Sequence, residues 1–125
     1  MTRLLLDTCT FLWWQADDPT LTPALRLVIG DAADVYVSAA SAWEISIKVG
    51  LGKLRIPEPV SIALPTFGFT ELPITVAHAE RVAALPLHHK DPFDRMIIAQ
   101  AQHEDLLIVT QDRIFQACGI AVLWD

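Results

Sequence analysis

The stretch HHKDPFDRMIIAQAQ, residues 88–102, combines the signals of a helix start with the apolar spacing of a core helix. Asp91 followed by Pro92 is typical of an N-cap and a first helical position. Asp94 then lies one turn into the helix, on the same face as Ile97, which should point to the core. A carboxylate in that place is either a capping-box acid or part of a functional site.

Around this stretch, short apolar runs alternate with helical patterns along the whole chain. We expect strands at residues 3–6, 35–37, 69–73, 106–110 and 120–123. We expect helices at residues 8–15, 23–32, 38–49, 59–68, 75–85, 93–104 and 113–117, the third closed by Gly50 and the fourth weakened by Pro65. Strands that alternate with helices predict an α/β fold of three layers, α/β/α, with a central parallel sheet.

Length and composition indicate one domain over residues 1–125, with 53% hydrophobic residues to build its core. No apolar run approaches the roughly 20 residues of a membrane span. Asp7 interrupts the apolar N-terminal run, which is unlike a signal peptide. Cys9 and Cys118 are isolated, so neither a disulfide framework nor a cysteine zinc site is indicated. We expect a soluble, cytoplasmic protein without membrane contact.

Carboxylates recur at related places in this pattern. Asp7 directly follows one of the expected strands, and Asp112 lies two residues past the end of another. Glu44 and Asp94 lie near the N-termini of two helices. In an open α/β sheet, sites form outside the carboxyl ends of the strands, where the strand order reverses. We therefore expect these acids to share one crevice.

Several carboxylates in one low-dielectric crevice repel each other and stay ionised only beside a cation. Oxygen ligands alone favour Mg²⁺ or Mn²⁺ over zinc. Such an ion polarises a phosphoryl oxygen and lowers the pKa of a bound water. The pattern therefore predicts metal-dependent hydrolysis of a phosphodiester.

The net charge of −6, from 9 basic and 15 acidic residues, by itself argues against a nucleic-acid binder. An acidic pocket that holds cations would reconcile this charge with a nucleic-acid substrate. We expect the basic residues near the acids in the sequence to hold the substrate backbone: Lys48, Lys90, Arg95 and Arg113.

Each acid also has a purely structural alternative. Asp7 and Asp112 can cap the helices that follow them, and Glu44 can pair with Lys48 four residues on. A non-catalytic interaction module, in which the acids are caps and ion pairs, therefore stays an alternative. A small metal-dependent phosphatase is another, although its nucleophilic-aspartate motif needs an Asp where this chain has Cys9. The adjacent His88 and His89 indicate a solvated loop.

Blocks of sequence in the same order resemble a known family. They are LLLDTCTFLWW (4–14), SAASAWEISIKVGLGKL (38–54), HHKDPFDRMIIAQA (88–101) and LLIVTQDRIF (106–115). Together they resemble PIN-domain toxins of the virulence-associated protein C (VapC) type, the toxin halves of bacterial type II toxin–antitoxin pairs.

The resemblance implies a PIN-like domain that acts as a Mg²⁺- or Mn²⁺-dependent endoribonuclease on RNA. It also implies neutralisation by a small cognate antitoxin, and commonly a homodimer. The metal-ligating and catalytic residues that it implies are Asp7, Glu44, Asp94 and Asp112. Thr8 and Thr110 stand where hydroxyls orient carboxylates or waters, and Asp91 is kept as a cap. The stretch at 54–69 is unusually apolar for a region rich in loop signals, which indicates a groove for the partner.

Overall fold

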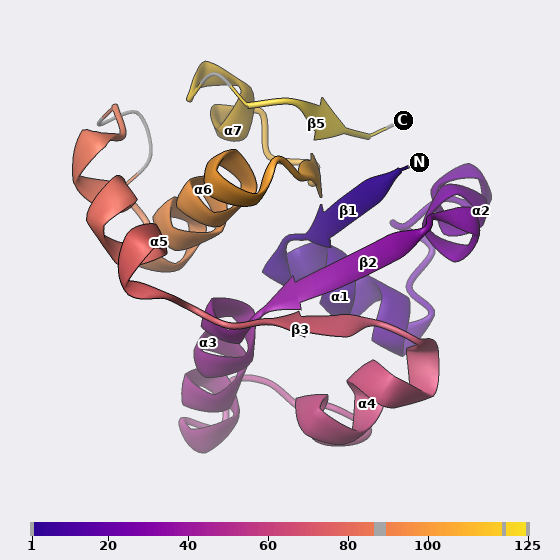
Figure 1. The fold of residues 1–125 in the computed structure, drawn as a ribbon. Helices are drawn as coiled ribbons and strands as arrows, with labels where there is room; N and C mark the ends of the chain where they lie inside the picture. The colour runs from indigo at the N-terminus through magenta and orange to yellow at the C-terminus, as the bar shows by residue number, and fades with distance from the viewer. Residues whose placement is uncertain (1, 87–89, 119, 125) are drawn as a thin grey trace.

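The computed structural model describes residues 2–86, 90–118 and 120–124, and Figure 1 shows its arrangement. The His88–His89 pair lies outside the described residues. The strands are β1 (Arg3–Leu6), β2 (Asp34–Ser38), β3 (Thr70–Leu72), β4 (Leu107–Val109) and β5 (Val122–Leu123). They form one sheet in the order β3-β2-β1-β4-β5, and every pair in it is parallel. The predicted parallel sheet is therefore confirmed.

Helices cover both faces of this sheet. They are α1 (Thr8–Ala16), α2 (Pro23–Asp31), α3 (Ala39–Gly50), α4 (Val60–Phe67), α5 (Val76–Arg81), α6 (Pro92–Glu104) and α7 (Ile114–Ala117), with a 3-10 turn η1 (Val82–Ala84). None of the described helices is long and apolar enough to cross a membrane.

Two hydrophobic cores flank the sheet, because successive side chains of a strand point to opposite faces. Leu4 and Leu6 pack with side chains from α1, α2, α3 and α4, whereas Leu5 packs with side chains from α6 and the segment around α7. All three leucines are 0% exposed. This double burial explains why β1 is apolar at successive positions and confirms the three-layer prediction.

The predicted helix ends agree with the structure to within one residue, except at the end of the helix expected at 75–85. The expected helix at 75–85 ends as α5 at Arg81 and continues as η1, whose Val82 carbonyl accepts hydrogen bonds from the Leu85 N–H and the Arg95 guanidinium. Gly50 does not close α3 from outside but is its last helical residue, and Gly52 instead takes the positive φ of 72°. The contact from Arg95 is tertiary, whereas the turn after α3 is held locally, since the Gly52 N–H donates to the Val49 carbonyl and the Lys53 N–H to the Lys48 carbonyl.

The strand order places two distant parts of the chain side by side. The chain runs from β1 outward to β2 and β3, and then returns to add β4 on the other side of β1. The order therefore reverses between β1 and β4, which are paired at Leu6 and Val109. The residues that follow these two strands meet at one edge of the sheet, as expected for a binding site.

Candidate active site

A cavity of about 350 Å³ lies beyond the carboxyl ends of β1 and β4. It is lined by Asp7, Thr8, Cys9, Trp13, Glu44, Lys48, Asp91, Asp94, Gln111 and Asp112. All the acids singled out from the sequence thus line one cavity, although they come from four different parts of the chain.

Asp7 lies at the inner wall of this cavity and is only 7% exposed. One carboxylate oxygen accepts the Thr10 N–H at 2.8 Å, which caps α1, and the other accepts the Thr110 hydroxyl at 2.6 Å. Burial raises the pKa of Asp7, the hydrogen bonds from Thr10 and Thr110 oppose that rise, and the negative charge of Asp112 adds to it. Asp7 therefore caps α1, while its burial disfavours the ionised form of its carboxylate.

The hydroxyl of Thr110 ties both strand ends of the cavity together. It donates to Asp7 and accepts the Asp112 N–H at 3.0 Å. Asp112 in turn accepts the Ile114 N–H at 3.0 Å, but the N-cap residue of α7 is Arg113, so Asp112 holds the turn before α7 and does not cap the helix. Thr8 differs from the expectation, because its hydroxyl donates to Ser41 at 2.9 Å and thereby ties α1 to α3.

Glu44 enters the cavity from α3 with a side chain that is only 12% exposed. One of its oxygens, Oε2, accepts from the ammonium of Lys48 at 3.1 Å, and this bond raises the pKa of Lys48. The other oxygen, Oε1, is buried without a hydrogen-bond partner. A buried carboxylate oxygen without a partner is unfavourable unless a cation or water binds there.

The N-terminus of α6 contributes both Asp91 and Asp94 to the cavity. Asp91 accepts the N–H groups of Phe93 and Asp94 at 2.8 and 3.1 Å, so it caps the helix as predicted. Asp91 was expected as a cap alone and not in the cavity wall. The three-residue spacing from Asp94 was the signal for that second role, since residues one turn apart share a helix face.

The cavity lies within a region that matches a known family. The PIN domain family matches residues 4–120. This chain belongs to the PIN-domain family. The expected resemblance is thereby confirmed at the level of the family and its fold.

Other PIN-related proteins resemble this chain along nearly its whole length. Ribonuclease VapC22 from Mycobacterium tuberculosis is 31% identical over 122 residues, which cover 90% of this chain and 89% of that protein. The DNA-bound VapBC structure from Salmonella typhimurium is 20% identical, covers 98% of both chains and has a TM-score of 0.72. A toxin–antitoxin complex from Klebsiella pneumoniae is 22% identical, covers 97% of this chain and 96% of that chain, and has a TM-score of 0.69. These structures share the fold.

Nucleases with PIN domains generally use divalent metal ions. The cavity of this PIN domain fits such an ion, because its ionisable oxygens are carboxylates and Glu44 keeps a buried oxygen without a partner. Among the described residues, the cavity acids do not form a group of three with ligand atoms within 4.8 Å of one another.

A different grouping, His78, His103 and Glu104, does bring three potential ligand atoms within 4.8 Å. His78 nevertheless caps α5, since its Nδ1 accepts the Thr75 N–H at 3.1 Å. The proton of the neutral ring is then on Nε2, which lies 3.2 Å from the Glu104 carboxylate. Because that nitrogen donates to Glu104, it has no lone pair for a metal, and the grouping is structural.

The basic residues expected to hold a substrate backbone are not gathered at the cavity. Lys48 lines the acidic cavity, whereas Lys90 and Arg95 line a separate, mainly apolar cavity. Arg113 lines a third cavity, which shares Asp112 with the acidic one. Arg95 donates to the Val82 and Pro86 carbonyls, so its contacts within this PIN domain stabilise the chain around η1.

Cys9 was also not expected among the residues that line the acidic cavity. Burial and the charges of Asp7 and Glu44 raise the pKa of its thiol to about 11. With this pKa the thiol is protonated at neutral pH.

Proposed function

We propose that this protein is a Mg²⁺- or Mn²⁺-dependent endoribonuclease and the toxin component of a type II toxin–antitoxin pair, acting on RNA in the cytoplasm. The observation that carries this proposal is the acidic cavity at the reversal of strand order, with an unpartnered buried oxygen on Glu44. The similarity to a ribonuclease of the VapC type supports the same assignment.

In this proposal the divalent ion is held by Asp7, Glu44, Asp94 and Asp112. When bound, the ion supplies a Lewis acid and an activated water for attack on the phosphodiester. Thr10 and Thr110 fix both oxygens of Asp7, so this carboxylate is already oriented before substrate arrives. The cap at Asp91 holds the first turn of α6 and thereby the position of Asp94.

RNA cleavage by the purified protein tests the proposal. We expect cleavage with Mn²⁺ or Mg²⁺, none with EDTA, and a loss of about 100-fold or more in Asp94→Asn. Asp105→Asn is a matched control, because Asp105 ends the same helix away from the cavity, in a left-handed conformation that Asn also accepts. Cleavage that survives in Asp94→Asn would reveal a contaminating nuclease. Release of phosphate from a phosphomonoester with RNA left intact would favour a phosphatase.

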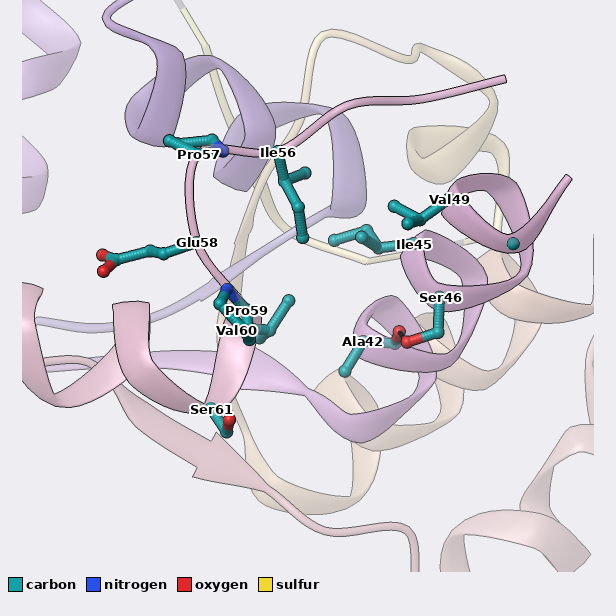
Figure 2. A pocket seen from close by; sticks show the side chains of 11 residues that line it. Ala42, Ile45, Ser46, Val49, Ile56, Pro57, Glu58, Pro59, Val60 and Ser61 are labelled. Atoms are coloured by element: carbon teal, nitrogen blue, oxygen red, sulfur yellow. Dashed lines mark hydrogen bonds between the residues drawn. The ribbon is translucent and has the colours of Figure 1, made fainter. Parts of the chain in front are cut away.

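We further propose that an antitoxin binds in the groove of about 670 Å³ between α3 and residues 56–61. Figure 2 shows Ile56 pointing toward Ile45 and Val49 in this groove, whereas Glu58 points away from it. The groove contains part of the apolar stretch at 54–69 from which a partner groove was expected. An apolar segment of the antitoxin fits these side chains.

This placement also links partner binding to the acidic cavity. One side of α3 contributes Ile45 and Val49 to the groove, and another side contributes Glu44 and Lys48 to the cavity. A segment bound in the groove would therefore contact the helix that carries Glu44.

A pair of valine substitutions tests the groove. Val49 lines it and Val28 lies on α2, outside its lining residues, and both are 40% exposed. We expect Val49→Glu to weaken antitoxin binding at least about 10-fold while RNA cleavage is retained, because a charge in an apolar groove is desolvated on binding. Val28→Glu should bind the antitoxin like the wild type. Equal antitoxin affinity in all three proteins would exclude this groove.

A homodimer is also part of the proposal. Trp43 on α3 is 62% exposed and packs edge-on against Phe93, and Val76 on α5 is 74% exposed. Trp43 and Phe93 line one mainly apolar hollow together with Ile74, and a contiguous exposed apolar surface is typical of a protein interface. Light scattering during gel filtration should give twice the mass of the chain, and a monomer mass at micromolar concentration would contradict the homodimer.

A further inference from the structure

The acidic cavity also contains a positive charge, the ammonium of Lys48, which is not needed for carboxylates to bind a metal ion. Its lining residues include Asp7, Glu44, Asp91, Asp94 and Asp112. Among the described residues that line it, Lys48 is the sole side chain with a fixed positive charge. Any cation that enters this cavity therefore meets an ammonium group already in place.

Lys48 and Glu44 are unequally exposed. The Lys48 side chain is 48% exposed and the Glu44 side chain 12%. The ammonium lies 3.1 Å from Oε2 of Glu44, while Oε1 is buried without a partner. Lys48 thus neutralises one oxygen of a carboxylate whose second oxygen still needs a ligand. A divalent ion that bound Oε2 would have to displace this ammonium.

We propose that Lys48 is a positioning residue that holds Glu44 until a metal ion binds, and then turns to contact a phosphate of the RNA. The second half of this inference rests on the proposed ribonuclease function. A divalent ion attracts the Glu44 carboxylate more strongly than one ammonium does, because its charge is doubled. The released ammonium is a compact charge on a flexible four-carbon stem, so it can reach a neighbouring phosphate.

The alternative is an ion pair that only stabilises α3, since Lys48 follows Glu44 by four residues. The two readings differ in their effect on metal binding. A lysine that competes with the metal lowers the affinity for the metal, whereas a helix-stabilising pair leaves it unchanged. They also differ in the salt dependence of RNA cleavage, because each phosphate contact adds to that dependence.

The first measurement is the affinity for Mn²⁺ without RNA, by electron paramagnetic resonance of free Mn²⁺. Lys48→Met should bind Mn²⁺ about 3- to 10-fold more tightly than the wild type, because the competing charge is removed. Lys53→Met is the matched control: Lys53 is exposed, follows α3 and does not line the cavity. It removes the same charge and should leave the affinity unchanged. Thermal unfolding in EDTA verifies that both variants are folded.

The second measurement is RNA cleavage at saturating Mn²⁺ over a range of salt concentrations. Lys48→Met should raise KM about 10-fold with kcat nearly unchanged, and should reduce the slope of log(kcat/KM) against log[salt] by about 0.7, the value for one phosphate contact on a single strand. Lys48→Arg keeps the charge and should restore most of the KM.

An unchanged Mn²⁺ affinity or an unchanged salt slope in Lys48→Met would overturn the inference. Failure of the proposed function gives a different result, because the wild-type protein would then bind Mn²⁺ without cleaving RNA. The Mn²⁺ measurement can therefore be judged whether or not RNA is the substrate.

Discussion

The carboxylate of Asp7 serves two purposes that oppose each other energetically. It caps α1 through the Thr10 N–H, yet it is almost fully buried beside other acids. Burial makes the charged form unfavourable without a cation, and a bound divalent ion would reverse this. Without a metal ion, the folded protein should therefore be destabilised at pH values at which Asp7 is ionised.

The raised pKa of Asp7 predicts how the free energy of unfolding depends on pH. The pKa of Asp7 in the folded protein lies above its ordinary value of 3.8, so the folded state holds the proton more tightly than the unfolded state. The stabilising contribution is then complete below the ordinary value and is lost as pH rises through the folded pKa. In EDTA, Asp7→Asn should retain the cap and lack this loss, so its melting temperature at neutral pH should equal or exceed that of the wild type.

The difference between the two proteins isolates Asp7 from the other carboxylates. Melting temperatures measured in EDTA from about pH 3 to pH 7 provide it. A wild-type protein that gains stability relative to Asp7→Asn as pH rises would contradict the raised pKa of Asp7.

At the scale of elements, two acids at the start of α6 have different roles: Asp91 caps the helix and Asp94 lines the cavity. Asp91 accepts two backbone N–H groups, and Pro92 has no N–H that needs a partner. Asp94 lies on the same helical side and extends into the cavity. The same turn therefore provides the start of a helix and part of the site.

Substitutions at these positions should separate the two roles. Asp91→Ala should lower the free energy of unfolding by about 1 kcal/mol because the cap is lost, and Asp91→Asn, which can still cap, by a few tenths at most. Asp94→Asn should leave unfolding in EDTA nearly unchanged and remove metal-dependent activity. Urea unfolding and RNA cleavage measure the two effects. The opposite pattern would mean that the roles of Asp91 and Asp94 are exchanged.

At the scale of the whole molecule, a metal bound in the cavity would join elements that are remote in sequence. Its proposed ligands follow β1, lie on α3, begin α6 and follow β4. An ion bound only to the folded state stabilises all of these elements together. Thermal stability should therefore report metal binding independently of any substrate.

Mn²⁺ at about 100 times its dissociation constant should stabilise the wild-type protein by about 2.7 kcal/mol. The corresponding rise in melting temperature should disappear in Asp94→Asn and in EDTA, while Asp105→Asn should keep it. Calorimetry with and without Mn²⁺ provides the measurement. An equal rise in Asp94→Asn would place the ion away from this cavity.

Much of the fold could be predicted because it is encoded locally. The apolar run of β1, the Asp91–Pro92 start of α6 and the alternation of strands with helices depend on neighbouring residues only. The expected end of the helix at 75–85 was wrong, because the contact of Arg95 with the Val82 carbonyl comes from elsewhere in the chain.

For the site, the sequence by itself determined which acids follow strands or begin helices, and hence which could meet. Only the tertiary structure decided that they do. The strand order places β4 beside β1, so that Thr110 donates to Asp7 across 103 positions of sequence. The pairing of Glu44 with Lys48 was already indicated by their four-residue spacing, but packing left the other oxygen of Glu44 buried without a partner. These features depend on distances between elements, and such distances are fixed by packing and strand order.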